Sequence, residues 1–217
     1  MKAFVITIKD LPQSVEYAQR CIDSAKKFGI DVEMFAAVTP KDDPETIFKA
    51  LNITDQYMDE VYSRRLNCMS AFLSHYSLWQ KCVADDEEYL IFEHDAVMYD
   101  KIPDVEYTCA MSIGKPSYGN YQEPQAPGVY PTFSKSGGYL PGAHAYMIKP
   151  LAAQWFVYEA TKGAKPTDVF LNNKLFPWLQ ELYPWVAKAE DSFSTIQVEQ
   201  GCLAKHNYNN NYELLDV

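Results

Sequence analysis

The chain has 217 residues, a hydrophobic fraction of 47%, an aromatic fraction of 14% and a formal net charge of −10. This length suits one well-formed core and is short for two domains, and the composition is that of a globular protein. The negative charge argues against broad binding to nucleic acid or to an anionic membrane, because both select basic surfaces. It also requires a local cation, such as a metal ion, wherever a phosphorylated ligand binds.

Cysteine usage and hydropathy indicate a reducing compartment and no membrane span. The five cysteines are odd in number, widely spaced and without a CxxC pair, which disfavours a disulfide framework or a structural zinc site. No apolar run approaches the roughly 20 residues that a membrane helix needs. The short N-terminal apolar run lacks a long hydrophobic region and a cleavage site, so it predicts a strand and not a signal peptide. We therefore expect a cytoplasmic protein without an integral membrane segment.

The first forty residues predict a strand, a helix and a second strand. The apolar run at 3–8 predicts the first strand, and apolar residues recur at helical spacing over 14–28. Gly29 stands just past that helix, where a C-terminal glycine is expected. Residues 30–38 then predict the second strand. Strand, helix and strand in this order form the unit that builds parallel sheets.

A second helix and strand follow a polar stretch at 40–66, which predicts a loop and the start of a helix. Residues 67–83 carry an apolar stripe at helical spacing, so this helix is expected to pack on the sheet. The acidic run at 85–88 predicts a solvated turn. The run at 89–92 predicts a buried strand.

The remaining chain predicts further strands and helices around one long loop. Residues 114–138 are rich in Gly, Pro, Ser and Tyr and have no periodicity, and a loop of that length is usually functional or mobile. The tail from about residue 207 is expected to be poorly ordered. We predict one α/β domain over residues 1–217. The other expected elements are strands at 108–113, 139–148 and 186–189, and helices at 150–161 and from 165.

The strand at 89–92 ends in Glu93, His94 and Asp95. Ligands of open parallel sheets bind at the carboxyl ends of the strands, where these three residues are expected. Carboxylate oxygens suit Mg²⁺ or Mn²⁺, and imidazole suits Mn²⁺ better than Mg²⁺. A bound cation would offset the negative charge of a diphosphate. On spacing alone, a plain strand-to-loop turn with exposed polar residues remains an alternative.

Two adjoining segments carry a family resemblance. The segment CMSAFLSHYSLWQKCV at 68–83 is followed, after a short acidic gap, by YLIFEHDAVM at 89–98. Together they resemble glycosyltransferase family 25, which includes lipopolysaccharide glycosyltransferases and collagen galactosyltransferases. The family has Glu-Asp-Asp where this chain has Glu93, His94 and Asp95, so an acid-x-acid motif is kept and the middle acid is lost. Supporting segments are AFVITIKD at 3–10, FAAVTP at 35–40, GAHAYMIKP at 142–150 and KPTDVFL at 165–171.

The resemblance implies a GT-A type fold, a Rossmann-like, mostly parallel central sheet flanked by helices. It implies an inverting transfer of a sugar from a nucleotide donor, usually a UDP-sugar, to a glycan acceptor, with Mn²⁺ or Mg²⁺ as cofactor. A bacterial envelope glycan, as in lipopolysaccharide biosynthesis, is the expected acceptor. Asp95, Glu93 and the late residue His206 are the expected metal ligands. Asp168 is the candidate catalytic base or acceptor clamp, with a helix N-cap as its alternative role. The expected donor-binding residues are Thr7, Lys9, Val38, Thr39, Arg64, His75, Glu93 and His94.

Three functions remain open from these residues. The first is a metal-dependent glycosyltransferase. The second is a non-catalytic relative that binds a nucleotide sugar or glycan, in which His94 marks a degenerate metal motif. The third, a metal phosphoesterase, would need a second carboxylate cluster, and the sequence offers none. The motifs GxGxxG, GxxxxGK[ST] and HExxH are absent, so dinucleotide oxidoreductases, P-loop nucleotidases and zincins are not supported.

Overall fold

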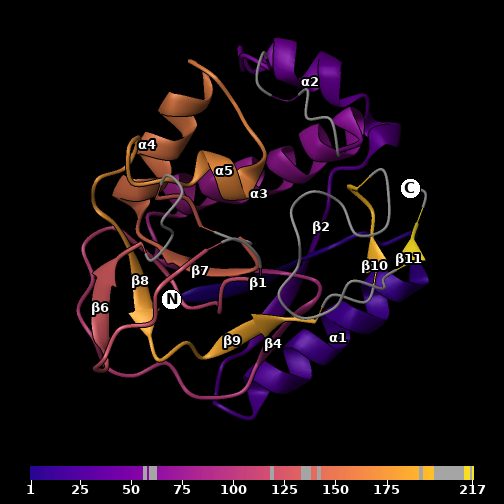
Figure 1. Ribbon diagram of the computed structural model, residues 1–217. Coiled ribbons are helices and arrows are strands. Elements are labelled where there is room, and N and C mark those ends of the chain that lie inside the picture. Colours follow the sequence, from indigo (N-terminus) through magenta and orange to yellow (C-terminus); the bar gives the residue numbers. More distant parts are fainter. Residues whose placement is uncertain are drawn as a thin grey trace.

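A seven-stranded sheet, in the order β2-β1-β3-β7-β5-β8-β6, forms the centre of the computed structural model (Figure 1). The structure describes residues 1–55, 58, 63–117, 120–132, 138–140, 143–190, 193–197, 213–215 and 217. The strands of this sheet are β1 (Lys2–Thr7), β2 (Val32–Ala36), β3 (Tyr89–Glu93), β5 (Ala110–Ser112), β6 (Gly128–Pro131), β7 (Ala145–Ile148) and β8 (Leu179–Tyr183).

The helices and two small sheets surround this centre. Two-stranded sheets pair β4 (Ala96–Met98) with β9 (Ala187–Ala189) and β10 (Phe193–Ser194) with β11 (Glu213–Leu214). In the part of the chain that the structure describes, no helix is long and apolar enough to cross a bilayer. The helices are α1 (Pro12–Lys26), the 3-10 helix η1 (Pro40–Asp42), α2 (Pro44–Ala50), α3 (Arg65–Asp85), α4 (Pro150–Ala160) and α5 (Thr167–Phe170).

Strand directions make the sheet mixed. β1 runs parallel to β2 and β3, and β5 runs parallel to β8. β7 lies between β3 and β5 and is antiparallel to both, and β6 is antiparallel to β8. Five strands therefore share one direction and two oppose it. The predicted α/β class with helices flanking a central sheet is confirmed.

The sheet is covered on both faces, which explains the continuous apolar run of β3. Tyr89 and Ile91 lie in the core on the α3 side, whereas Leu90 and Phe92 lie in the core on the α1 side. This is the period-two alternation of a strand that is buried on both faces. Figure 1 shows α1 on one side of the sheet and α3, α4 and α5 on the other. Gly29 follows α1 with a φ of 78°, a left-handed conformation that favours glycine.

Several expected elements differ from the structure. The strand expected at 139–148 begins only at Ala145, and the helix expected from 165 is the single turn α5. The loop at 114–138 contains β6, and β8 was not predicted because Gln180 and Glu181 interrupt its apolar pattern. Glu181 is nevertheless buried, at 1% exposure. Because polar residues interrupt this core strand, hydrophobic periodicity did not predict β8.

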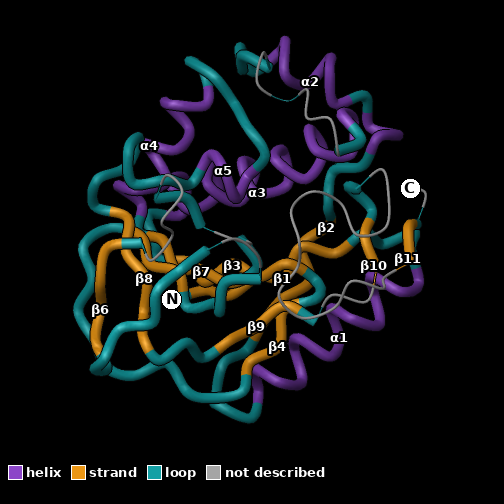
Figure 2. Tube along the Cα trace, in the orientation of Figure 1, coloured by secondary structure: helices purple, strands orange, loops and turns teal. Residues whose placement is uncertain are grey.

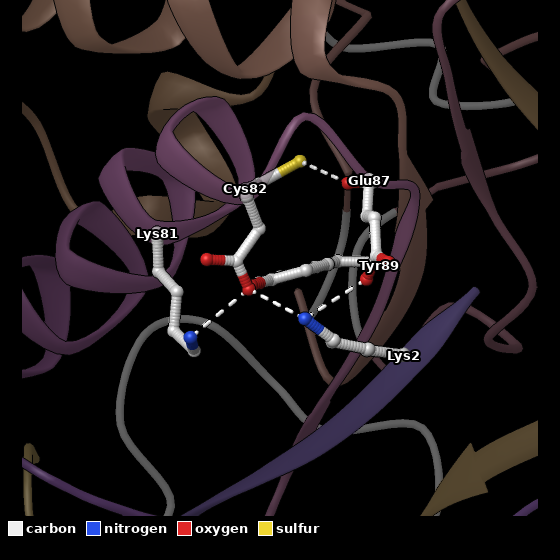
Figure 3. Close-up of polar contacts among 6 residues, drawn as sticks. Lys2, Lys81, Cys82, Glu87 and Tyr89 are labelled. Atoms are coloured by element: carbon white, nitrogen blue, oxygen red, sulfur yellow. Dashed lines mark hydrogen bonds and ion pairs between the residues drawn. The ribbon is translucent and has the colours of Figure 1, made fainter.

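The acidic run at 85–88 is more than a solvated turn. Lys2 Nζ, Lys81 Nζ and the Tyr89 hydroxyl donate to one carboxylate oxygen of Asp85, at 2.8, 3.0 and 2.6 Å (Figure 3). Lys2 Nζ also pairs with Glu87 at 2.9 Å. These hydrogen bonds hold the pKa of Asp85 well below its ordinary value. The run thereby ties the start of β1 to the connection between α3 and β3.

Candidate functional site

The carboxyl ends of β1, β2 and β3 lie side by side, as the sequence predicted (Figure 2). Thr7 is paired in register with Ala36, and Ile6 is paired with Glu93. The Ala37 N–H donates to the Thr7 carbonyl at 2.9 Å, which keeps β1 and β2 together beyond their last register pair. The residues that follow the three strands are therefore gathered at one edge of the sheet.

Glu93 is held by a series of hydrogen bonds that begins in the core. Trp79 Nε1 donates to the Tyr146 hydroxyl oxygen at 2.9 Å, and Tyr146 lies 2.8 Å from Nδ1 of His75. His75 Nε2 lies 3.2 Å from Oε1 of Glu93. Because an indole N–H can only donate, the Tyr146 hydroxyl hydrogen is available to Nδ1 of a neutral His75. Nε2 then carries the proton that is donated to Glu93.

This series runs from a dry interior to an accessible carboxylate. The His75 side chain is 2% exposed, whereas the Glu93 side chain is 37% exposed. Burial raises the pKa of Glu93, but its interactions with His75, above all the hydrogen bond, lower it more, so the pKa lies below its ordinary value. Glu93 is thus an oriented, ionised acceptor at the sheet edge.

His144, the residue just before β7, packs beside Glu93. Its backbone carbonyl accepts the Glu93 N–H at 2.9 Å, and its side chain is 1% exposed. Its ring lies so close to Gly114 that a Cβ there would stand 2.3 Å from Nε2. Gly114 is therefore required by close packing against this imidazole.

His94 is fixed as a neutral imidazole on the α1 side of Glu93. The Ser14 hydroxyl oxygen accepts the Ile8 N–H at 2.9 Å and lies 3.1 Å from His94 Nδ1, so its hydrogen can be donated to that nitrogen. Phe193 stacks on the ring with centroids 5.1 Å apart. Burial lowers the pKa of His94 to about 4, although Glu93 opposes the shift. At neutral pH the middle residue of the acidic motif therefore carries no charge.

Asp95 lies next to the pairing of β4 with β9, and its carboxylate affects Cys21 of α1. Its carbonyl accepts the Glu190 N–H at 2.9 Å, next to the pairing of β4 with β9. Burial raises the pKa of the Cys21 thiol in α1, and the Asp95 carboxylate raises it further. Glu93 instead interacts with His75 of α3. The two carboxylates of the predicted metal motif therefore have different surroundings.

The described residues do not fit a metal ion by themselves. Within them, no group of three or more His, Cys, Asp or Glu side chains is arranged to hold one. Glu93 accepts a hydrogen bond from His75, and the Asp95 carboxylate raises the pKa of the Cys21 thiol in α1. His206, the predicted third ligand, lies outside the described residues.

The predicted donor-binding residues fall into two groups. Those near Glu93 are Thr7, whose hydroxyl donates to the Val5 carbonyl at 3.0 Å, and Val38, whose N–H donates to Ser74 Oγ at 2.9 Å. Ser74 precedes His75 in α3, so it ties the end of β2 to that helix. Lys9 is exposed in the turn after β1.

Thr39 and Arg64 have structural partners at the rim of this edge. The Thr39 N–H and hydroxyl both donate to Asp42 Oδ2, at 2.7 and 2.9 Å, in the capping box of η1. Arg64 precedes α3, and its Nη1 donates to the Leu215 carbonyl at 2.7 Å. Arg64 therefore holds a segment near the C-terminus next to the start of α3.

Asp168, the candidate base, lies at the start of α5. Its Oδ1 accepts the N–H of Val169 at 2.9 Å, and its side chain is half-buried. Phe170 of the same turn packs against Phe72 and Trp79 of α3. Asp168 is therefore carried by the helical layer that also presents His75.

Tyr146 and Ser14 were not predicted as site residues. Tyr146 reads as one more apolar residue of a strand, and Ser14 reads as the start of an amphipathic helix. Their contacts reach His75 and His94 across 71 and 80 residues of sequence. The one available signal was GAHAYMIKP at 142–150, which carries both His144 and Tyr146.

Comparison with known proteins gives a family match over the first half of the chain. The model of the family described as "Glycosyltransferase family 25 (LPS biosynthesis protein)" matches residues 1–119, just over half of the 217. None of the curated proteins matches the chain. The matched span contains β1, β2, α3 and β3, and so contains Glu93, His94, Asp95 and His75.

Proposed function

The chain belongs to glycosyltransferase family 25, and from this premise we propose that it moves a sugar from a nucleotide donor, UDP-linked, to a hydroxyl group of a glycan. One observation carries the proposal. The family match covers the three parallel strands whose carboxyl ends meet, and the buried His75 holds an ionised Glu93 at that edge. Nucleotides bind at this edge of open α/β sheets. The family description favours an envelope glycan of the lipopolysaccharide type as acceptor.

The proposed transfer inverts the anomeric centre in one displacement. The acceptor oxygen forms a bond to the anomeric carbon while the bond from that carbon to the diphosphate oxygen breaks. A general base must take the acceptor proton, and we assign this role to the Asp168 carboxylate. Its hydrogen bond from Val169 N–H restricts the side chain.

Glu93 is assigned to donor binding. An ionised carboxylate only accepts hydrogen bonds, so it suits the ribose hydroxyls of a nucleotide. His75 occupies Oε1 at 3.2 Å and thereby fixes the direction of the remaining acceptor positions. Thr7 and Val38 shape the ends of the neighbouring strands.

Mn²⁺ or Mg²⁺ dependence stays a prediction. A divalent ion would stabilise the departing diphosphate as a Lewis acid. The described residues do not form a site for it, so the roles of Asp168 and Glu93 above are assigned without it.

A second candidate function is binding of a nucleotide sugar without transfer. The observation that favours it is the neutral His94 in the middle of the acidic motif, in a neighbourhood with no described three-ligand cluster. In this reading the sheet edge keeps its nucleotide-binding geometry and lacks the groups that activate the leaving diphosphate.

A thermal-shift screen and a turnover assay test both candidates. UDP-, GDP- and CMP-sugars are each added with Mn²⁺, Mg²⁺ or EDTA, and a bound donor should raise Tm by mass action. A transferase should release UDP, and Asp168→Asn should lower turnover about 10²- to 10⁴-fold while the UDP-sugar shift persists. Asp95→Asn should reduce a metal-dependent shift, with Asp100→Asn at an exposed position as its control.

Three outcomes decide between the candidates. Binding without UDP release, with every acceptor class tested, would support the non-catalytic function. Full turnover in Asp168→Asn would remove Asp168 as the base. No shift with any nucleotide sugar, with or without metal, would overturn both candidates.

A further inference from the structure

One face of α4 exposes a row of large apolar side chains. Leu151, Trp155 and Tyr158 are 54%, 47% and 53% exposed. Their spacing of four and three residues puts them on one side of the helix. We refer to these three residues as the α4 aromatic face. The opposite side is buried in the core through Ala152, Ala153, Phe156 and Ala160.

The α4 aromatic face has organised side chains and a basic rim. The rings of Trp155 and Tyr158 meet edge to face with centroids 6.0 Å apart. Lys162 Nζ lies 4.1 Å from the centre of the Tyr158 ring and forms an ion pair with Glu159 at 2.7 Å. Trp, Tyr and Lys are the residue types that anchor proteins at the boundary between water and lipid.

The segment after α5 packs against the buried side of α4. Phe176 and Trp178 pack on Phe156 of α4 with ring centroids 4.6 and 5.6 Å apart. The same segment exposes Lys174 and Leu175, the latter at 38%. This lysine and leucine therefore reach solvent from a segment that packs on α4.

Local charge runs against that of the whole chain. Residues 149–178 contain four lysines against Glu159 and Asp168, a net charge of +2, whereas the complete chain carries −10. An anionic surface would therefore be repelled less by this region than by the rest of the molecule. The overall acidity excludes broad membrane binding and still permits binding through this one face.

The size of the α4 aromatic face argues against a stable dimer. Three half-exposed side chains offer on the order of 300 Å² of apolar surface, compared with about 800 Å² per partner in a standard interface. A bilayer needs less, because amphipathic surfaces bind by inserting a few side chains and by attraction to anionic lipids.

We propose that the α4 aromatic face binds the surface of a lipid bilayer that carries anionic headgroups. Leu151 and Trp155 would insert at the level of the headgroups and upper acyl chains, with Lys162 and Lys174 near the phosphates. The proposal does not depend on the proposed function. For an enzyme whose acceptor glycan is attached to a lipid, such binding would raise the local concentration of acceptor.

Vesicle co-sedimentation of the full chain tests the proposal. The probes are vesicles of phosphatidylcholine alone and of phosphatidylcholine mixed with phosphatidylglycerol. We expect binding to the mixed vesicles, weakened by salt.

The double variant Leu151→Ser and Trp155→Ser should lower the partition coefficient about tenfold or more. Lys162→Glu with Lys174→Glu should remove the preference for anionic vesicles. Tyr99→Ser, at a 47% exposed tyrosine outside α4, is the matched control.

The results that would overturn the proposal are distinct. Wild-type protein that stays in the supernatant with both vesicle types would end it, and this measurement needs no variant. Equal binding by the α4 double variant and the wild type would show that another surface contacts the vesicle, and would overturn the proposal. A dimer in analytical ultracentrifugation that the same double variant dissociates would make this face a contact between copies of the chain. Circular dichroism checks that the variants are folded.

Discussion

At the amino ends of β1 and β3, the Asp85 carboxylate accepts hydrogen bonds from two lysines and a tyrosine. At the carboxyl ends of the same strands, the Glu93 carboxylate accepts one from a histidine. Asp85 has its charge matched by cations, and its role is to join segments of the fold. Glu93 is oriented by a buried side chain and keeps acceptor positions toward solvent. An oriented carboxylate with a perturbed pKa at a ligand-binding edge is a functional candidate, whereas a fully paired one is structural.

Between these two ends of the strands, the larger effect on activity is expected from removing the charge at the carboxyl end. Glu93→Gln should lower kcat/KM for the nucleotide sugar about 10- to 100-fold, because a hydrogen bond to a charged group contributes about 1.5–3 kcal/mol. Steady-state kinetics measure the loss, and Tm should change little since Glu93 is partly exposed. Unchanged kinetics would show that the donor binds elsewhere, and Glu93 could then not be called a functional carboxylate in contrast to Asp85.

Removing the Tyr146 hydroxyl, which holds His75 behind Glu93, should lower both stability and activity. Tyr146→Phe leaves the buried Trp79 N–H and His75 Nδ1 without their shared partner, at a cost of about 1–3 kcal/mol in the free energy of unfolding. Urea unfolding measures this, and kcat should fall because Glu93 is less well oriented. Tyr76→Phe is the control. Tyr76 of α3 is buried like Tyr146 of β7, but its hydroxyl makes no hydrogen bond among the described residues. Equal losses in the two variants would argue against an orienting role.

His94 should make stability depend on pH between about 6.5 and 4. Its folded pKa of about 4 lies below the ordinary 6.5, so the unfolded chain takes up a proton first as the pH falls. The stability from neutral His94 is therefore full above pH 6.5 and is lost as the pH falls toward 4. His94→Asn should flatten this part of the profile, as measured by urea midpoints across pH. A profile that is identical in variant and wild type would show that His94 titrates normally.

The smallest effect is expected at the amino end. The folded pKa of Asp85 is lowered from 3.8, so its contribution to stability is present above that value and is lost as the pH falls below it. Asp85→Asn should lower Tm at neutral pH and reduce the further loss on acidification, with kcat/KM unchanged. A loss of activity comparable to that of Glu93→Gln would contradict the division between the two ends.

Periodicity predicted the first half of the fold well. The elements β1, α1, β2, α3 and β3 have apolar patterns that match their burial on one or both faces. The prediction failed where burial and polarity diverge, as at Glu181 in β8, which is buried at 1% exposure. A charged residue in a core strand gives no signal in an apolar pattern.

The position of the candidate residues at a strand end was predicted, and their side-chain contacts were not. The sequence places Glu93 and Asp95 at a strand end, and the structure places them there. Their spacing predicts one shared metal site, and this stays a prediction. In the structure Glu93 contacts His75, and Asp95 precedes the pairing of β4 with β9. The contact of His75 with Tyr146 spans 71 residues, and one sequence offers no means of pairing them.

The reversed strand β7 has a consequence for dissecting the molecule. Residues 145–148 lie between β3 and β5, although both of those strands belong to the span that matches the family. A fragment ending at residue 119 would leave β3 and β5 each with an uncovered edge where β7 belongs, and such edges pair with other chains. The stretch that identifies the family is thus not a separable folding unit, and expression of that stretch alone should yield aggregates.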